Sequence, residues 1–222
     1  MLELKRNKLQ NIPLCTKFRG SKIVIDRQKD SHPHSVYTWH NFVYICDLGA
    51  DKIWIYQREK LHKMDHVAQT PSGWGPRHMA FLNRKAYVLF ELKNQIGVYD
   101  IDETSGSLKN VQNVETAPQG LKKHCTRVWF SETLILFFLG DNPEYGAEIE
   151  IHPNGKWLYT SNRGTGPIVL YHIKEDGTLI NKKVLLGVQL KYDLEVILQY
   201  STRDSRWSFS NIYNWNRLSK VV

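Results

Sequence analysis

One pattern occurs three times in this sequence: a run of strand-forming residues that ends in a polar cluster, followed closely by a second such run. The longer runs cover residues 42–49, 86–92 and 157–164, and the shorter ones cover 52–56, 95–99 and 167–171. Tyr44 and Tyr87 hold the same place in the first two units and lie about 43 residues apart, the spacing of propeller blades. The repeat therefore predicts an all-β fold, a β-propeller of four-stranded antiparallel blades.

Turn-forming residues divide each unit into successive strands. The first unit is expected to form strands at 36–47, 52–57 and 64–69, and the second at 78–81, 87–91, 96–101 and 108–114. In the third unit, Asn154-Gly155 predicts a tight hairpin between 149–151 and 156–161, with a last strand at 178–186. We therefore expect three recognisable blades within residues 31–187.

Three segments depart from the repeat. Residues 1–30 form an irregular basic N-terminal segment in which only Ser21–Asp26 has the pattern of a strand. Residues 122–140 are an atypical insertion between the second and third units, and residues 188–222 are a divergent C-terminal segment rich in Trp, Arg and Asn.

Charge and hydropathy argue against nucleic acid and membranes as partners of this chain. The net charge is +8, but the basic residues are scattered and form neither a Lys/Arg stripe nor an RNA-reading motif, so we expect no nucleic-acid partner. The longest apolar run, Leu134–Leu139, is far shorter than the roughly 20 residues of a membrane-spanning helix, which predicts no membrane association. The charged start lacks the apolar core of a secretory signal and predicts a cytoplasmic location.

The sequence predicts neither a metal nor an organic cofactor. Cys15, Cys46 and Cys125 are too far apart to form a zinc motif or a disulfide framework, and they are expected to be reduced thiols. His32 and His34 share one face of a strand but lack a third ligand in a matching context.

Five short motifs follow one another in a characteristic order: Ser31–Val36, Asp47–Asp51, Gly75–His78, Tyr145–Ile149 and Ser161–Gly164. With these motifs the chain resembles the lactonase family of seven-bladed β-propellers, which includes bacterial 6-phosphogluconolactonase and the fungal carboxymuconate-lactonising enzyme. The resemblance covers residues 28–121 and 141–187. It implies an incomplete circle of blades, and hence either weakened activity or self-association through open blade edges.

Charged side chains stand where the inner strands are expected to end, and in a propeller such ends face the central channel. Opening a lactone needs a base that activates water, a partner for the negative charge that develops on the carbonyl oxygen, and groups that hold the substrate. Either Glu91 or His34 would serve as the base, and the planar fork of Arg77 suits a phosphate or a carboxylate.

By resemblance, the catalytic candidates are His34, Arg77 and Glu91, although Phe90 precedes Glu91 where the family usually has Asn. The substrate-binding candidates are His32, Asp47, His78, Glu148, Asn162 and Arg163. The resemblance implies a small anionic substrate, either a phosphorylated sugar lactone or a carboxylated lactone.

The main functional prediction is a 6-phosphogluconolactonase-like hydrolase that opens a sugar lactone by water attack without a metal. Two alternatives stay open: a carboxymuconate-type lactonising cycloisomerase, which would use the same cluster of cations, and a catalytically inactive propeller fragment that acts as a binding module. Structural roles also stay open for His34 as an inter-blade contact, Arg77 as a partner of a carboxylate such as Asp47, and Asp47 as a turn residue.

Overall fold

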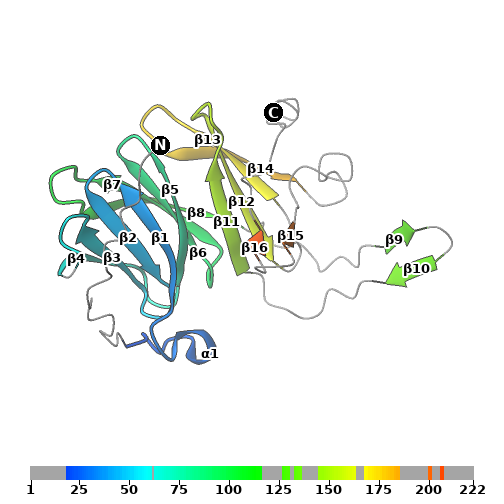
Figure 1. Ribbon diagram of the computed structural model, residues 1–222. Coiled ribbons are helices and arrows are strands. Elements are labelled where there is room, and N and C mark those ends of the chain that lie inside the picture. Colours follow the sequence, from blue (N-terminus) through cyan, green and yellow to red (C-terminus); the bar gives the residue numbers. More distant parts are fainter. Residues whose placement is uncertain are drawn as a thin grey trace, which may run out of the picture.

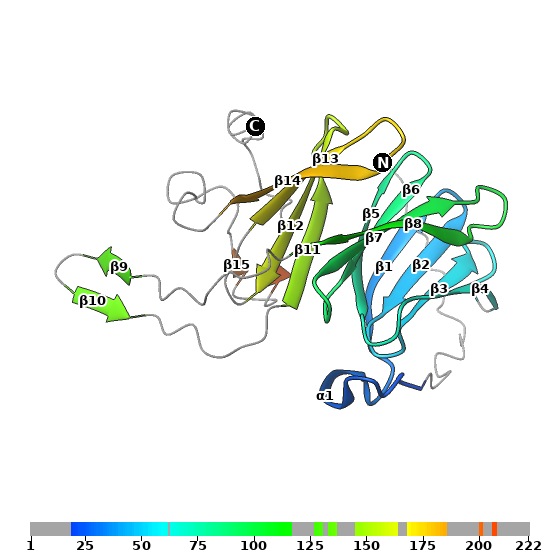
Figure 2. The same cartoon turned by 180° about the vertical axis from the view of Figure 1, so that it is seen from behind.

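The computed structural model describes residues 19–61, 63–116, 127–130, 133–136, 145–163, 168–185, 200–201 and 206–207. Three four-stranded sheets dominate this part of the chain, and in each of them consecutive strands are antiparallel neighbours. The sheets face one another and fan out, as the two opposite views show (Figures 1 and 2). The predicted all-β architecture of propeller blades is therefore confirmed.

The blades follow the order of the sequence. The first contains β1 (Pro33–Trp39), β2 (Phe42–Asp47), β3 (Lys52–Gln57) and β4 (Met64–Gln69). The second contains β5 (Pro76–Leu82), β6 (Lys85–Phe90), β7 (Gln95–Ile101) and β8 (Leu108–Glu115). The third contains β11 (Tyr145–Ile151), β12 (Trp157–Arg163), β13 (Ile168–Ile173) and β14 (Leu179–Leu185).

Two further strand pairs lie in the segments that depart from the repeat. The predicted insertion at 122–140 contributes β9 (Arg127–Phe130) and β10 (Thr133–Leu136), and the predicted C-terminal segment contributes β15 (Tyr200–Ser201) and β16 (Arg206–Trp207). The rest of both segments lies outside the described residues, as do residues 1–18. In the described ranges, no helix has the length and apolar character needed to cross a membrane.

The N-terminal segment differs from its prediction. The expected strand at Ser21–Asp26 is wrong, because the chain here enters the short helix α1 (Ile25–Gln28). The helical turn buries the side chain of Gln28, whose amide donates to Leu48 O at 2.9 Å and to Asp51 Oδ1 at 2.7 Å. These buried hydrogen bonds hold α1 against the first blade. The expected strand at 36–47 is also divided, since the chain turns at His40 and Asn41 between β1 and β2.

Apolar side chains fill the spaces between neighbouring blades. Tyr44 and Val88 belong to the cluster between the first and second blades, whereas Leu89 and Leu158 belong to the cluster between the second and third. Adjacent side chains of β6 therefore point to opposite faces of the same sheet, because side chains alternate in direction along a β-strand. Because both faces are covered, the run Ala86–Phe90 is apolar throughout rather than alternating.

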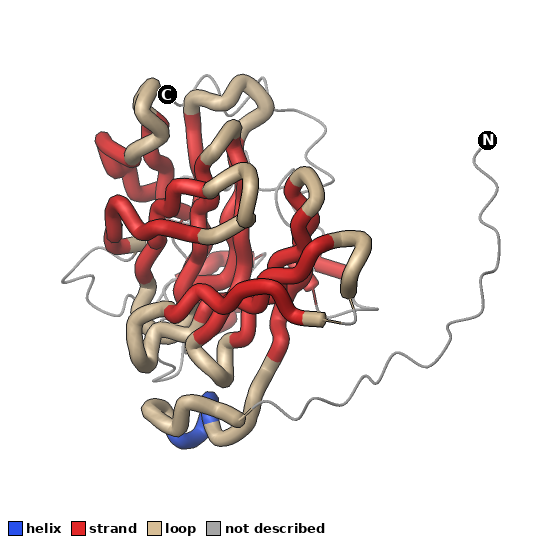
Figure 3. The backbone as a smooth tube through the Cα atoms, turned by 90° about the vertical axis from the view of Figure 1, so that its left-hand side faces the viewer, coloured by secondary structure: helices blue, strands red, loops and turns tan. Residues whose placement is uncertain are grey.

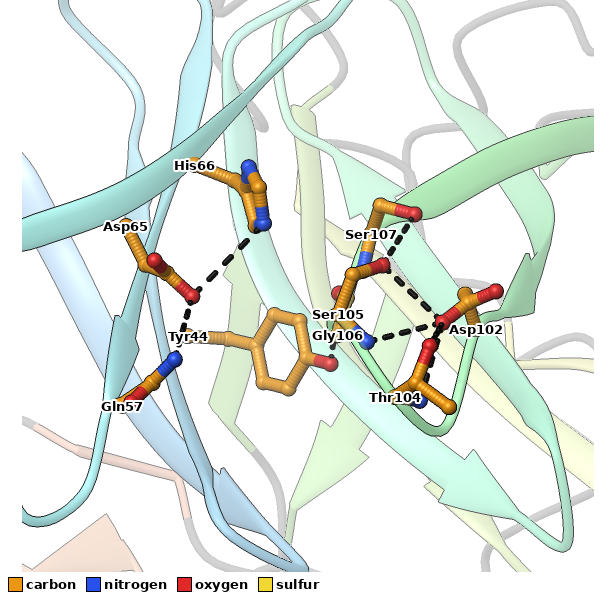
Figure 4. Close-up of polar contacts among 9 residues, drawn as sticks. All are labelled: Tyr44, Gln57, Asp65, His66, Asp102, Thr104, Ser105, Gly106 and Ser107. Atoms are coloured by element: carbon orange, nitrogen blue, oxygen red, sulfur yellow. Dashed lines mark hydrogen bonds and ion pairs between the residues drawn. The ribbon is translucent and has the colours of Figure 1, made fainter.

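The tyrosine that repeats in the sequence joins each of the first two blades to the next one. Tyr44 donates from Oη to Gly106 O at 2.9 Å, in the hairpin between β7 and β8 (Figure 4). Tyr87 donates in the same way to Gly177 O at 2.9 Å, in the hairpin between β13 and β14. Both glycines have positive φ, 71° and 78°, a conformation that glycine adopts without a steric penalty. The period of the sequence thus reflects an inter-blade contact.

Candidate functional site

The three inner strands β1, β5 and β11 begin at one edge of the blades, and β5 is the neighbour of both others. The ends of β2, β6 and β12 lie at the same edge, because each runs antiparallel to its inner strand. Helix α1 lies at this end of the sheets (Figure 3). We call this edge, formed by residues 31–35, 75–78, 91, 145–148 and 163, the site edge.

Each inner strand carries a β-bulge close to its start. The pairing with the second strand shifts there by one residue, and the residues left without an opposite partner are His34, Arg77 and Ala147. A bulge bends the strand and re-aims the side chain of the extra residue. Two of the three predicted catalytic residues thus occupy equivalent bulge positions in neighbouring blades.

Glu91 follows β6 directly and lies at the centre of the site edge. Its backbone is fixed on both sides, because its N–H donates to Gly75 O at 2.9 Å and its carbonyl accepts from Gly146 N at 3.1 Å. The side chain is only 1% exposed. Three arginines from three different elements contact its carboxylate: Arg27 at Oε1, Arg77 at Oε2 with 2.7 Å from Nε, and Arg163 at Oε1 with 2.8 Å.

The arginines determine the charge state of Glu91. Burial alone would raise the pKa of this carboxyl group, but the positive charges of Arg163, Arg27 and Arg77 outweigh burial and lower it. The contact of Arg77 Nε with Oε2 is an ion pair whose geometry does not satisfy a hydrogen bond. Glu91 is therefore an ionised carboxylate that holds three guanidinium groups together, and its lone pairs already face cations.

His78 and Glu148 form a second charged pair next to this cluster. The Nδ1 atom of His78 contacts Glu148 Oε1, and its Nε2 atom lies 3.2 Å from Arg77 Nη1. An arginine can only donate, so Nε2 must accept and the ring proton must sit on Nδ1, where it is donated to Glu148. The two partners thus select one neutral tautomer of His78 and connect the second and third blades.

The ring of His34 lies against that of His78 in a tilted arrangement, with 5.0 Å between the ring centroids and 59° between the ring planes. His34 keeps one side exposed to solvent, but neighbouring groups partly desolvate its ring, and this desolvation together with the positive charge of Arg77 lowers the pKa of His34 to about 4. The imidazole is therefore neutral at pH 7 and carries a lone pair on one ring nitrogen. Electrostatic coupling to Arg77, Glu91 and Arg163 places His34 in the same group as the other candidates.

The structure brings six of the nine predicted site residues into this group: His34, Arg77, His78, Glu91, Glu148 and Arg163. Asp47 is also buried at this edge, but it accepts hydrogen bonds from His32 N at 2.8 Å, Ala50 N at 3.0 Å and Trp54 Nε1 at 3.0 Å. These bonds close the turn after β2, in agreement with the structural alternative for Asp47.

The other two predicted residues stand apart from the cluster. The ring of His32 is directed to the carbonyl of Arg27, with 3.1 Å from Nδ1. Asn162 is 4% exposed, and its Oδ1 accepts from Thr116 Oγ1 at 3.1 Å. Neither residue has a described contact with Glu91 or His78.

Two residues of the site were missed by the sequence analysis. Arg27 belongs to α1, outside the repeat, and no motif marks it. Tyr145 begins β11, and its ring lies under two guanidinium groups, at 5.0 Å from Arg27 Cζ and 5.8 Å from Arg163 Cζ. Such cation–π contacts help to keep two like charges side by side. Tyr145 opens the motif Tyr145–Ile149, and this was the signal that could have pointed to it.

The arrangement combines fixed cations with neutral imidazoles. Guanidinium groups hold an anion and stabilise negative charge that develops during a reaction, and a neutral imidazole accepts a proton. Among the residues that the structure describes, no group of three His, Cys, Asp or Glu side chains has the spacing of a metal site.

Comparison with known proteins agrees with this architecture. Residues 3–185 match the sequence profile of the family described as "Lactonase, 7-bladed beta-propeller". A 6-phosphogluconolactonase of Pectobacterium atrosepticum is 30% identical over 162 residues, which are 70% of this chain and 43% of the relative. A 6-phosphogluconolactonase of Bacillus subtilis is 27% identical over 156 residues, which are 67% of this chain and 39% of the relative.

Solved structures show the same fold. The periplasmic gluconolactonase of Pseudomonas aeruginosa superimposes with a TM-score of 0.60 and 25% identity, over 75% of this chain and 44% of that protein. The chain thus spans less than half the length of the relatives that it matches. A periplasmic relative also means that the cytoplasmic location stays a prediction. By its profile, its relatives and its blades, the chain belongs to the lactonase family of seven-bladed β-propellers.

Proposed function

We propose that this chain carries the catalytic edge of a 6-phosphogluconolactonase-like hydrolase, which opens a sugar lactone by water attack. The observation that carries this proposal is the convergence, at one edge of two neighbouring blades, of a neutral His34 with Arg77 and His78. The relatives named 6-phosphogluconolactonase support the choice of substrate class.

His34 is the proposed general base, and Glu91 organises the arginines. Glu91 is almost fully buried and surrounded by cations, which makes it a poor proton acceptor. His34 takes a proton from water, and the resulting hydroxide attacks the lactone carbonyl carbon. The oxyanion that forms is stabilised by Arg77. The C–O ester bond then breaks, and the ring oxygen takes up the proton and leaves as a hydroxyl group, so water is consumed and a hydroxy acid is formed.

Binding of the substrate would change the pKa of His34. A pKa of about 4 leaves His34 unprotonated but weakly basic in the free protein. Binding of an anionic substrate offsets the positive charge of Arg77 and Arg163, so it raises the pKa of His34 towards the usual value for histidine. The base thus becomes stronger when the substrate is in place.

The proposed reaction needs no metal, and the excess of positive charge supports this view. A divalent cation would be repelled by the three arginines around Glu91. The proposal predicts full activity after dialysis against a chelator, and a requirement for an added divalent metal would refute this part of it.

The direct test is an assay of the purified chain with freshly prepared 6-phosphogluconolactone, corrected for spontaneous hydrolysis. We expect acceleration by the unaltered chain and a loss of about 100-fold in kcat/KM for Arg77→Ala. Arg84→Ala is the matched control, because Arg84 lies at the opposite edge of the second blade with a side chain 69% exposed. No acceleration by the unaltered chain, at concentrations where it is folded, would refute the hydrolase activity and favour the binding-module alternative.

A further inference from the structure

Arg27 and Arg163 form a pair of guanidinium groups that differs from Arg77. Both contact the same oxygen of Glu91, Oε1, and both lie over the ring of Tyr145. Arg77 instead contacts Oε2 and is 15% exposed, whereas the side chains of Arg27 and Arg163 are 32% and 47% exposed. The first two therefore present their outer N–H groups to solvent, and Arg77 lies deeper.

The positive charge of this pair is only partly balanced by the described carboxylates. Glu91 supplies one negative charge to three arginines, and Glu148, the next carboxylate in the cluster, is bonded to His78. Two like charges that share one carboxylate oxygen repel each other and gain from a further anion between them. The contacts described for each guanidinium group use only some of its five N–H donors, which form a planar fork that matches the oxygens of a phosphate.

The position of Arg27 is set by buried contacts. Its neighbour Gln28 is fully buried and hydrogen-bonded to Leu48 O and Asp51 Oδ1, and Asp51 also accepts from Gly73 N at 2.7 Å and Gly75 N at 2.8 Å. The same network thus fixes α1 and the turn that leads into β5. Arg27 is held in place before any ligand arrives, which reduces the entropy lost on binding.

We propose that Arg27 and Arg163 bind the phosphoryl group of a phosphorylated sugar lactone, while the lactone ring lies against His34, Arg77 and His78. This assignment takes the substrate class from the proposed function and deepens it. It makes Arg27, which lies outside the repeated blades, the residue that distinguishes phosphorylated from unphosphorylated lactones.

Binding of inorganic phosphate tests the site without any catalysis. Titration calorimetry at constant ionic strength would compare the unaltered chain with Arg27→Gln, Arg27→Lys and Arg84→Gln. We expect Arg27→Gln to weaken phosphate binding about tenfold, which corresponds to about 1.4 kcal/mol, and Arg27→Lys to weaken it less. Arg84→Gln removes the same charge at the opposite edge and should leave binding unchanged. If Arg27→Gln and Arg84→Gln weakened phosphate binding equally, the loss of affinity would be explained by the lower net charge of the protein alone, and the proposal would be overturned.

Steady-state kinetics with two lactones test the selectivity. For 6-phosphogluconolactone, Arg27→Gln should raise KM about tenfold with kcat within twofold. For the unphosphorylated glucono-δ-lactone, which offers no phosphoryl group to Arg27, the rise in KM should be much smaller. An equal loss on both lactones would show that Arg27 acts only through Glu91, and it would overturn the proposal. Unchanged melting temperatures would show that each variant is folded.

The two proposals fail in different ways. If neither lactone is opened by the unaltered chain, the hydrolase function is refuted, and the phosphate titration alone decides the role of Arg27. Phosphate binding that is lost in Arg27→Gln and kept in Arg84→Gln would then still support the site. Absence of phosphate binding by the unaltered chain would overturn it.

Discussion

At the edge where the inner strands begin, Glu91 of the second blade contacts arginines from α1 and from the third blade, whereas Asp102 at the opposite edge of the same blade contacts its own hairpin. Asp102 Oδ1 accepts from Thr104 N at 2.9 Å and Ser105 N at 2.8 Å (Figure 4). One carboxylate thus joins elements that are distant in sequence, and the other closes a turn of five residues, Asp102–Gly106.

The two carboxylates therefore differ in what keeps them ionised. Asp102 depends on a local turn, whereas Glu91 depends on elements that only the complete fold brings together. The side-chain and backbone bonds of Thr104 and Ser105 lower the pKa of Asp102 although the residue is fully exposed. Glu91 is also ionised, but because helix α1, the second blade and the third blade each supply one of its cations. A shifted pKa therefore indicates a functional site only where the groups that shift it come from different helices or strands.

The largest effect should follow the removal of the proposed base. His34→Gln keeps a polar side chain at the bulge of β1 but cannot accept a proton at neutral pH. We expect kcat for 6-phosphogluconolactone to fall about 1000-fold, within the range for loss of general base catalysis, while KM changes little. Asp102→Asn at the opposite edge should keep full activity. A His34→Gln variant with more than one tenth of the original kcat would assign the base to another residue.

Glu91→Gln should reduce both activity and stability. It removes the one anion that three arginines share, so the guanidinium groups repel each other and move apart. We expect a fall in kcat/KM of about 100-fold and a decrease in the free energy of unfolding of about 3 kcal/mol, measured by urea denaturation. If Glu91 were instead the base, Glu91→Gln would lower kcat at least as strongly as His34→Gln, which steady-state kinetics of the two variants would reveal.

The pH dependence tests the charge state of His34. In the free protein its pKa is lowered to about 4, so kcat/KM should stay constant from neutral pH down to about pH 5 and fall below it. The acidic limb of kcat should lie at higher pH than that of kcat/KM, because a bound anion raises the pKa of the base. The unfolded chain binds more protons than the folded one between the ordinary histidine pKa of 6.5 and about 4. His34 therefore adds stability above that window, and its contribution is lost as the pH falls through it.

The inter-blade tyrosines should affect stability alone. Tyr44→Phe or Tyr87→Phe removes a buried hydrogen bond to the next blade and leaves Gly106 O or Gly177 O without its donor. We expect a loss of about 1 kcal/mol in the free energy of unfolding for each variant, with kcat/KM within twofold. Tyr56→Phe on β3 is the matched control. A large loss of activity in Tyr44→Phe would show that the two edges are coupled through the blade interface.

The fold could be predicted from the sequence because the repeat sets the position of each strand, and Tyr44 and Tyr87 occupy equivalent places in their blades. The cluster at the site edge was predictable for the same reason, since His34, Arg77 and Glu91 all lie at strand ends. Arg27 was not predictable, because its segment has no repeat to give it a position. The strand expected there failed because local pattern does not reveal that Gln28 is buried among the turns of the first blade.

The bulge near the start of each inner strand is a position where the side chain differs from blade to blade while the backbone stays the same. An imidazole, a guanidinium and a methyl group occupy this position in three successive blades on the same backbone kink. A side chain at this position has no residue directly opposite it on the second strand. It can therefore be replaced by one with a different functional group while the hydrogen bonds between the strands stay as they are. Ala147 carries only a methyl group at this position, directly before Glu148 of the charged cluster, and is therefore a natural position at which to introduce another functional group.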